Sequence, residues 1–255
     1  MKRYLPLFLL ILIFNSACSP TSSTNEPIET QPPVIFSTAT KSSATMSPNI
    51  ITSEPGTSTR ESEPAFLVEP RGDLIWSDDF SDTNSGWDIT ETVDKITDYI
   101  NGGYRMWLDK SQYDIWANSG QFFPDPVIVE VDATKTGGPD DNDFGIICDY
   151  QDTDNFHVGL ISSDGYTVIA KLEDQIWEYL SSETMMAVDS INLGEATNHI
   201  RFDCNQGNLT LYVNGTLIAN TFDNTFTGGD VGLIIGTFDN GGVDILFDNF
   251  EVREP

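Results

Sequence analysis

The C-terminal part of this chain alternates apolar and polar side chains at every second position, over many short segments. In residues 127–133, three valines and an alanine share one face, whereas Ile128, Glu130 and Asp132 share the other. This period of two places one face of a β-strand in a core. The same pattern predicts strands at Tyr104–Asp109, Phe144–Tyr150, Phe156–Ile161, Tyr166–Leu172, Ile200–Cys204, Leu209–Val213, Val231–Ile235 and Ile245–Val252.

Turn sequences separate these segments, and helical periodicity of useful length is missing between them. The clearest turn is Asn214-Gly215, because both residues tolerate the positive φ angles of a two-residue hairpin. Many short strands joined by turns indicate an all-β, antiparallel sandwich or barrel. About 185 residues are ample for one core. We therefore predict a single domain over residues 71–255.

The N-terminus has the order of an export signal. Lys2 and Arg3 precede an apolar run from Leu5 to Phe14, and three small or polar residues then lead to Cys18. A membrane-spanning helix needs about 20 apolar residues, and this run is about half as long. Residues 15–18, Asn-Ser-Ala-Cys, resemble the bacterial lipobox, although its usual leucine is replaced by asparagine. We predict a lipoprotein signal peptide at 1–17; a plain cleaved signal and a retained anchor are the alternatives.

Lipidation of Cys18 predicts an extracytoplasmic protein, anchored to the cell membrane or displayed at the cell surface. The segment that follows is rich in Ser, Thr and Pro, which occupy 27 of the 52 positions from 19 to 70. Such a composition buries too little apolar surface to repay chain ordering, so residues 18–70 are predicted to be a disordered tether. Residues 71–255 hold 34 acidic and eight basic side chains, which argues against a nucleic-acid partner.

Several short strings recur in an order that is known from one superfamily. They are Asp78–Phe80, Ser85–Trp87, Gly102–Tyr104, Val127–Ala133, Gly145–Cys148, Asn198–Phe202, Leu209–Gly215, Gly228–Leu233 and Phe247–Val252. Together they resemble the concanavalin A-like lectin and glucanase superfamily, in particular jelly-roll modules related to laminin G domains and to the 3-keto-disaccharide hydrolase domain. The resemblance implies two antiparallel sheets, one of them concave, on a fold that often binds carbohydrate and only sometimes cleaves it.

Two cysteines lie within the predicted domain. Cys148 shares a strand face with Phe144 and Ile146, and Cys204 shares one with Ile200 and Phe202, so both are expected in the core. An exported compartment permits oxidation. We predict a disulfide between Cys148 and Cys204; two separate buried thiols are the alternative.

Catalytic signatures are sparse. Glu130 and Asp132 share a strand face and match the first half of the ExDxxE motif of laminarinase-like glucanases, but Lys135 stands at the third acidic position. The two histidines, His157 and His199, both lie in predicted strands and are expected to be structural or edge-facing. The sequence contains neither a GxSxG nor an HExxH motif. No catalytic residue is therefore assigned, and Glu130 and Asp132 remain candidates.

Calcium is the one cofactor that the composition favours, since oxygen ligands are abundant. Asp78 and Asp79 are candidates to meet Asp248 near the ends of the sandwich. Modules similar to this one often hold a structural calcium near their terminal strands. No other cofactor is expected.

Sugar binding requires aromatic rings that stack on a pyranose, with polar groups nearby. Trp107 shares its strand face with Arg105 and Asp109, Trp116 alternates with polar residues, and Trp177 follows an acidic turn. These residues predict a non-catalytic module that binds carbohydrate or cell-envelope glycan. A glycoside hydrolase or 3-keto-disaccharide hydrolase-like enzyme, and a protein-binding adhesion or scaffold module, are the alternative functions.

Overall fold

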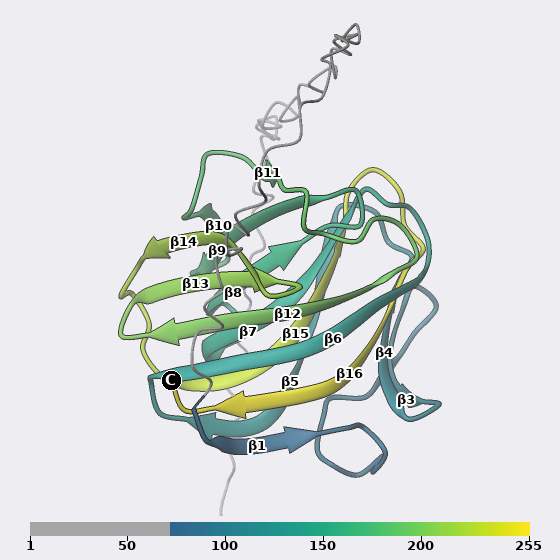
Figure 1. Cartoon of the computed structure of the whole chain (residues 1–255). Helices are drawn as coiled ribbons and strands as arrows, with labels where there is room; N and C mark the ends of the chain where they lie inside the picture. The colour runs from purple at the N-terminus through teal and green to yellow at the C-terminus, as the bar shows by residue number, and fades with distance from the viewer. Residues whose placement is uncertain (1–71) are drawn as a thin grey trace, which may run out of the picture. The chain divides into compact units, whose positions relative to one another are not determined.

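A computed structural model of the chain describes residues 72–255. The part that it describes contains strands and turns and no helix (Figure 1). The all-β prediction is therefore confirmed. The predicted signal peptide at 1–17, Cys18 and the tether at 18–70 lie outside the described residues. Between residues 72 and 255, no helix is long and apolar enough to cross a membrane.

The strands form two antiparallel sheets. The nine-stranded sheet contains β1 (Leu74–Asp78), β2 (Thr90–Glu91), β3 (Lys95–Ile100), β4 (Gly103–Leu108), β6 (Val127–Gly137), β12 (Thr197–Asn205), β13 (Asn208–Val213), β14 (Thr216–Phe222) and β16 (Val243–Arg253). Its order is β14-β13-β12-β6-β16-β4-β3-β2, and β1 also pairs with β16.

The seven-stranded sheet contains β5 (Tyr113–Phe123), β7 (Asn142–Asp152), β8 (Asn155–Ile161), β9 (Tyr166–Glu173), β10 (Ile176–Tyr179), β11 (Met186–Ala187) and β15 (Gly229–Thr237). Its order is β10-β9-β8-β7-β15-β5, and β11 pairs with β9. The last strand to join each sheet enters its interior: β15 lies between β7 and β5, and β16 lies between β6 and β4.

The main core lies between the two sheets, where the alternation of the sequence places it. In β6, Val129, Val131 and Ala133 are fully buried, and they belong to the same core cluster as Phe144 and Ile146 of the opposite sheet. Each predicted strand appears in the structure. The alternation missed β1, β2, β3, β10, β11, β14 and most of β5. The second half of β5 reads Asn-Ser-Gly-Gln and lacks a clear period.

Cys148 of β7 and Cys204 of β12 form a disulfide, as predicted. Both residues are fully buried in the main core. Because β7 and β12 belong to different sheets, this bond joins the two layers of the sandwich covalently.

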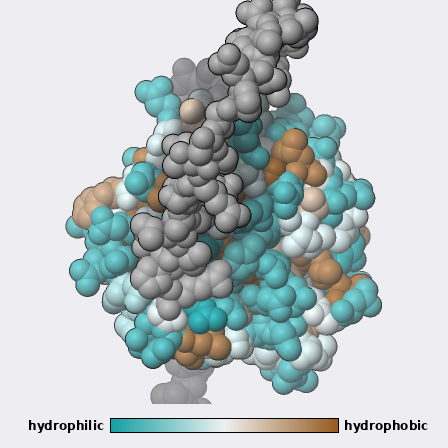
Figure 2. All heavy atoms as spheres, viewed as in Figure 1, coloured by the Kyte–Doolittle hydropathy of each residue, from teal (hydrophilic) through white to brown (hydrophobic). Residues whose placement is uncertain are grey.

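The surface agrees with the acidic composition. On the face seen in Figure 2, hydrophilic side chains cover most of the described surface and hydrophobic residues form only small, separate patches. A site on this face therefore cannot be recognised by a large exposed apolar patch.

Candidate functional site

The outer face of the seven-stranded sheet, which points away from the main core, carries a second apolar layer. Its buried members come from four strands and form a cluster of their own: Ile147, Phe156, Val158, Leu160, Val168, Ala170, Leu172 and Ile234. Trp116, Tyr150, Tyr179 and Met185 pack against them. An apolar layer outside the main core of a highly charged domain is a feature that requires a ligand or a cover.

Aromatic rings gather at the centre of this layer. Phe156 is fully buried, and its ring centroid lies 5.4 Å from that of Trp116, 5.7 Å from Tyr150 and 5.9 Å from Trp177. We call these four residues, together with Tyr179, the aromatic face.

The rings of the aromatic face come from distant strands. Trp116 lies on β5 and Phe156 on β8, and β15 and β7 separate these strands. At about 4.8 Å per strand, a flat sheet sets β5 and β8 about 14 Å apart. The two side chains therefore reach toward one another over β15 and β7.

Two aspartates lie next to the aromatic face. Asp114 of β5 and Asp143 of β7 are both in register with Gly236 of β15, which runs between them. Because Gly236 has no side chain, the two carboxyl groups lean over it from either side. The position that a Cβ on Gly236 would take is 2.2 Å from Oδ1 of Asp143 and 2.3 Å from Oδ1 of Asp114. We call these two residues the carboxyl pair.

Burial shapes the electrostatics of the carboxyl pair. Burial raises the pKa of Asp114 to about 6, against a hydrogen bond from Trp177 that lowers it. Burial, and then the negative charges of Asp114 and Asp141, raise the pKa of Asp143 well above its ordinary value. Oδ1 of Asp143 is buried and accepts no hydrogen bond within the described structure. The site is therefore acidic and short of hydrogen-bond donors.

The structure brings two of the three predicted sugar-binding tryptophans together. Trp116 and Trp177 both contact Phe156 on the aromatic face. Trp107 does not join them, because it lies on β4 in the other sheet.

The polar neighbours predicted for Trp107 have other roles. Arg105 forms a two-point ion pair with Asp244 of β16, at 2.8 Å from Nε and 2.6 Å from Nη2. Asp109 is exposed just beyond the end of β4. The expected group of Trp107, Arg105 and Asp109 therefore lies on the nine-stranded sheet, apart from the aromatic face.

The catalytic candidates also lie on the nine-stranded sheet. Asp132 accepts hydrogen bonds from Nδ1 of His199 at 2.8 Å and from Nδ2 of Asn249 at 3.0 Å. Glu130 is buried, and Nε of Arg253 lies 3.7 Å from its carboxylate. Both acids of this strand are thus engaged with neighbouring side chains of the same sheet.

The acids predicted to bind calcium make local contacts. Asp78 accepts hydrogen bonds from the Phe80 amide at 2.8 Å and from the Trp87 indole at 3.0 Å. Asp79 accepts from Ser81. Both line a pocket of about 320 Å³, with Ser77, Asn249, Phe250 and Glu251.

Asp248 lies outside the lining of that pocket and accepts from the amide of Asn249. Within residues 72–255, one group of three candidate ligand side chains lies within metal-binding distance, namely Cys148, Asp149 and Cys204. Its two sulfur atoms form the disulfide. Calcium at Asp78, Asp79 and Asp248 therefore stays a prediction.

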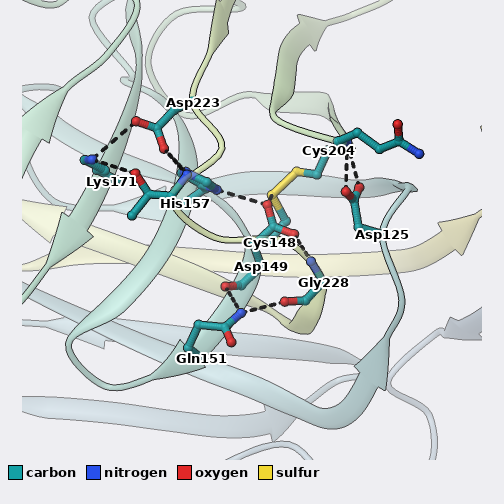
Figure 3. Close-up of polar contacts among 11 residues, drawn as sticks. Asp125, Cys148, Asp149, Gln151, His157, Lys171, Cys204, Asp223 and Gly228 are labelled. Atoms are coloured by element: carbon teal, nitrogen blue, oxygen red, sulfur yellow. Dashed lines mark hydrogen bonds and ion pairs between the residues drawn. A yellow bond between two sulfur atoms is a disulfide. The ribbon is translucent and has the colours of Figure 1, made fainter.

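A second polar cluster lies inside the sandwich, beside the disulfide (Figure 3). His157 is fully buried, with Nδ1 3.0 Å from Asp149 and Nε2 3.0 Å from Asp223. Lys171 also binds Asp223, at 3.2 Å. Burial raises the pKa of Asp223, but hydrogen bonds from Thr225, His157 and Lys171 outweigh it and hold that pKa below its ordinary value.

This cluster connects the chain segment after β14 to β7, β8 and β9, which are interior strands of the seven-stranded sheet. Asp149 accepts a hydrogen bond from the Gly228 amide at 2.8 Å, and Gln151 donates to the Gly228 carbonyl. His157 therefore links two carboxylates inside the protein, where it holds the backbone in place.

Sequence analysis missed Asp114, Asp143, Tyr150, Phe156 and Tyr179. The alternation around Trp116 does place Asp114 on the same face as that ring. The partner of Asp114 was not visible, because Asp143 reaches it only through the pairing of β5 and β7 with β15.

Among the comparisons with known proteins, the one with solved structures found matches. No family model matches the sequence, and none of the curated proteins matches it. Among solved structures, the carbohydrate-binding module CBM66 from Bacillus subtilis is 16% identical at a TM-score of 0.53, over 67% of this chain and 96% of that one.

Two further solved structures are similar. A protein of unknown function with a galectin-like fold from Bacillus subtilis is 11% identical at a TM-score of 0.52, over 72% of this chain and 97% of that one. A beta-glucanase from Bacillus licheniformis is 10% identical at a TM-score of 0.52, over 71% of this chain and 98% of that one. The two sheets of this chain thus form a concanavalin A-like jelly-roll sandwich, the fold that the sequence resemblance implied.

Proposed function

We propose that this domain binds carbohydrate on the aromatic face, without cleaving it. The observation that carries the proposal is the convergence of Trp116 and Trp177 on Phe156, beside the carboxyl pair. Aromatic rings offer an apolar surface to a pyranose, and a few polar groups fix its hydroxyls. Trp177 is 37% exposed and is the ring most accessible to a ligand, whereas the fully buried Phe156 supports it from below.

The similar structures support a carbohydrate ligand. One is a carbohydrate-binding module and another is a beta-glucanase. Hydrolysis by Glu130 and Asp132 is the alternative, but no contact in the structure favours it, because both acids already contact side chains of their own nine-stranded sheet. An adhesion or scaffold role predicts that the full chain binds proteins and no glycan.

Trp177→Ala is expected to weaken glycan binding at least about tenfold. Removing a central aromatic anchor from a binding site commonly costs about 2 kcal/mol. A glycan array first identifies a ligand for the full chain, and titration calorimetry then measures its affinity for each variant. Trp107→Ala is the matched control, since it removes the same side chain from the other sheet and should leave the affinity unchanged. Loss of binding in Trp107→Ala alone would place the site on the nine-stranded sheet instead.

The same proposal includes presentation of the domain at the membrane by a lipid on Cys18. Cys18→Ser is expected to move the protein from the membrane fraction to the soluble fraction, because the serine hydroxyl cannot form the thioether. Fractionation followed by immunoblotting measures this. Asn15→Leu restores the usual lipobox residue and should leave the protein in the membrane fraction. Retention of Cys18→Ser in the membrane would show that another segment holds the protein there.

A further inference from the structure

The two carboxyl groups of the pair face one another above Gly236. Oδ1 of Asp114 and Oδ1 of Asp143 both approach the point where a Cβ on Gly236 would lie, at 2.3 and 2.2 Å. A Cβ at position 236 would collide with both oxygens. Glycine therefore lets two carboxyl oxygens come together above β15.

One carboxyl oxygen of the pair lacks a hydrogen-bond donor. Asp143 is only 7% exposed, and its Oδ1 accepts no hydrogen bond within residues 72–255. The charges that act on it, from Asp114 and Asp141, are both negative. A buried carboxyl oxygen without a donor is costly. Its cost falls when it accepts a hydrogen bond, above all from a positively charged donor.

The two buried lysines of residues 72–255 are paired with other acids. Lys135 lies 2.6 Å from Asp140, and Lys171 binds Glu173 and Asp223. The charges that raise the pKa of Asp143, those of Asp114 and Asp141, are negative. The missing positive charge is therefore one that a ligand would bring.

The surroundings favour an organic cation over a metal ion. Calcium takes six to eight oxygen ligands, whereas the neighbours of the pair are aromatic. Trp177 lies near enough to lower the pKa of Asp114, and Tyr179 lies near enough for Asp114 and Asp143 to raise its pKa, after burial as the main cause. Carboxylates combined with tryptophan and tyrosine rings bind ammonium groups by charge and by cation–π attraction.

We propose that the carboxyl pair recognises the free, protonated amine of an amino sugar, so that the ligand of the aromatic face is a polysaccharide containing glucosamine-type residues without N-acetyl groups. This rests on the proposed function, since the ring of the sugar stacks on Trp177. An ammonium group has three N–H donors. One donates to Asp114 and one to Asp143, and the third remains for solvent or a sugar oxygen.

The proposal also states which glycans are rejected. An N-acetyl group removes the positive charge and adds bulk at the carboxyl pair. Uronic acids and sulfated sugars bring negative charge to a domain with 34 acidic and eight basic residues in positions 71–255, and like charges placed together at a site are repelled.

Titration calorimetry of the full chain at pH 7 with two matched probes tests the inference. The probes are a glucosamine hexasaccharide and an N-acetylglucosamine hexasaccharide, which have the same backbone and differ only in acetylation. The glucosamine probe is expected to bind at least about tenfold more tightly, the change that corresponds to one charge-assisted contact.

Variants then locate the amine. Asp143→Asn and Asp114→Asn keep the side-chain shape and should each abolish the tenfold preference, whereas Asp141→Asn, which removes a nearby charge outside the pair, should keep it. Gly236→Ala places a methyl group between the two carboxyl oxygens and should also abolish the preference. Thermal unfolding of each variant confirms that it is folded before its binding is measured.

The outcomes separate this inference from the proposed function. Equal binding of both probes, sensitive to Trp177→Ala and insensitive to Asp143→Asn, would overturn amine recognition and leave carbohydrate binding intact. Binding of no glycan at all would overturn both. Tight binding of calcium chloride that is lost in Asp143→Asn, without any preference for the glucosamine probe, would show that the pair holds a metal ion and would overturn the amine proposal.

Discussion

Replacing Cys148 and Cys204 together by alanine is expected to lower the free energy of unfolding by about 4 kcal/mol. The disulfide links residues 56 positions apart in the sequence and joins β7 of one sheet to β12 of the other. A cross-link that closes a loop of this length restricts the unfolded chain by about that amount. Urea unfolding, monitored by tryptophan fluorescence, measures the difference between the variant and the oxidised protein.

Two controls separate the bond from the packing of its atoms. Wild-type protein unfolded in reductant loses the bond and keeps both sulfur atoms, so it should account for most of the loss seen in the double variant. Cys148 and Cys204 should also resist a thiol reagent when the protein is unfolded without reductant. Rapid reaction of both thiols under that condition, with an unchanged urea midpoint in reductant, would contradict the disulfide.

The free energy of unfolding is expected to fall as pH rises from about 4 to about 7, because of the carboxyl pair. Burial raises the pKa of Asp114 from 3.8 to about 6 and raises the pKa of Asp143 well above its ordinary value. In this range the folded protein binds more protons than the unfolded chain, so stability decreases with increasing pH. The stabilisation is complete below pH 4 and is lost as pH rises through 6. The shift at Asp114 corresponds to a loss on the order of 3 kcal/mol.

Urea titrations at several pH values, compared between the wild type and Asp143→Asn, measure this effect. Asparagine does not titrate, so the variant should lose the part of the slope between pH 4 and 7 that comes from Asp143, whereas Asp114, whose pKa is raised by burial, should keep its own part. The pH dependence of stability that comes from Asp223 has the opposite sign. Because the pKa of Asp223 is lowered, its contribution to stability is lost only as pH falls below 4. Trp107→Ala, an uncharged change on the other sheet, should keep the wild-type slope. An unchanged slope in Asp143→Asn would contradict the raised pKa of Asp143.

The local alternation of apolar and polar residues predicted much of the fold correctly. Alternation in residues 127–133 correctly assigned Val129, Val131 and Ala133 to the core. It also placed Cys148 and Cys204 on core faces, where they form a disulfide. These predictions succeed because the side-chain direction in a strand reverses at each residue, so a local pattern reports which side is buried.

The site was less predictable. The sequence favoured three tryptophans as equals, but Trp107 lies on β4 in the nine-stranded sheet, whereas Trp116 and Trp177 meet on the seven-stranded sheet. Alternation around each tryptophan shows only that it faces away from its own strand's apolar side. It does not show which sheet the strand joins, because that choice depends on pairing between distant segments.

What the sequence by itself determined is nine of the longer strands, the face of each that is buried, and the all-β class that follows from them. Only the tertiary structure decided which residues lie side by side at the site. Asp114, Gly236 and Asp143 occupy one row across β5, β15 and β7, although up to 122 positions separate them in the sequence. The physical reason is that strand pairing is set by the packing of the whole sandwich, and the carboxyl pair, its buried oxygen and its aromatic neighbours exist only once β15 has entered the sheet between β5 and β7.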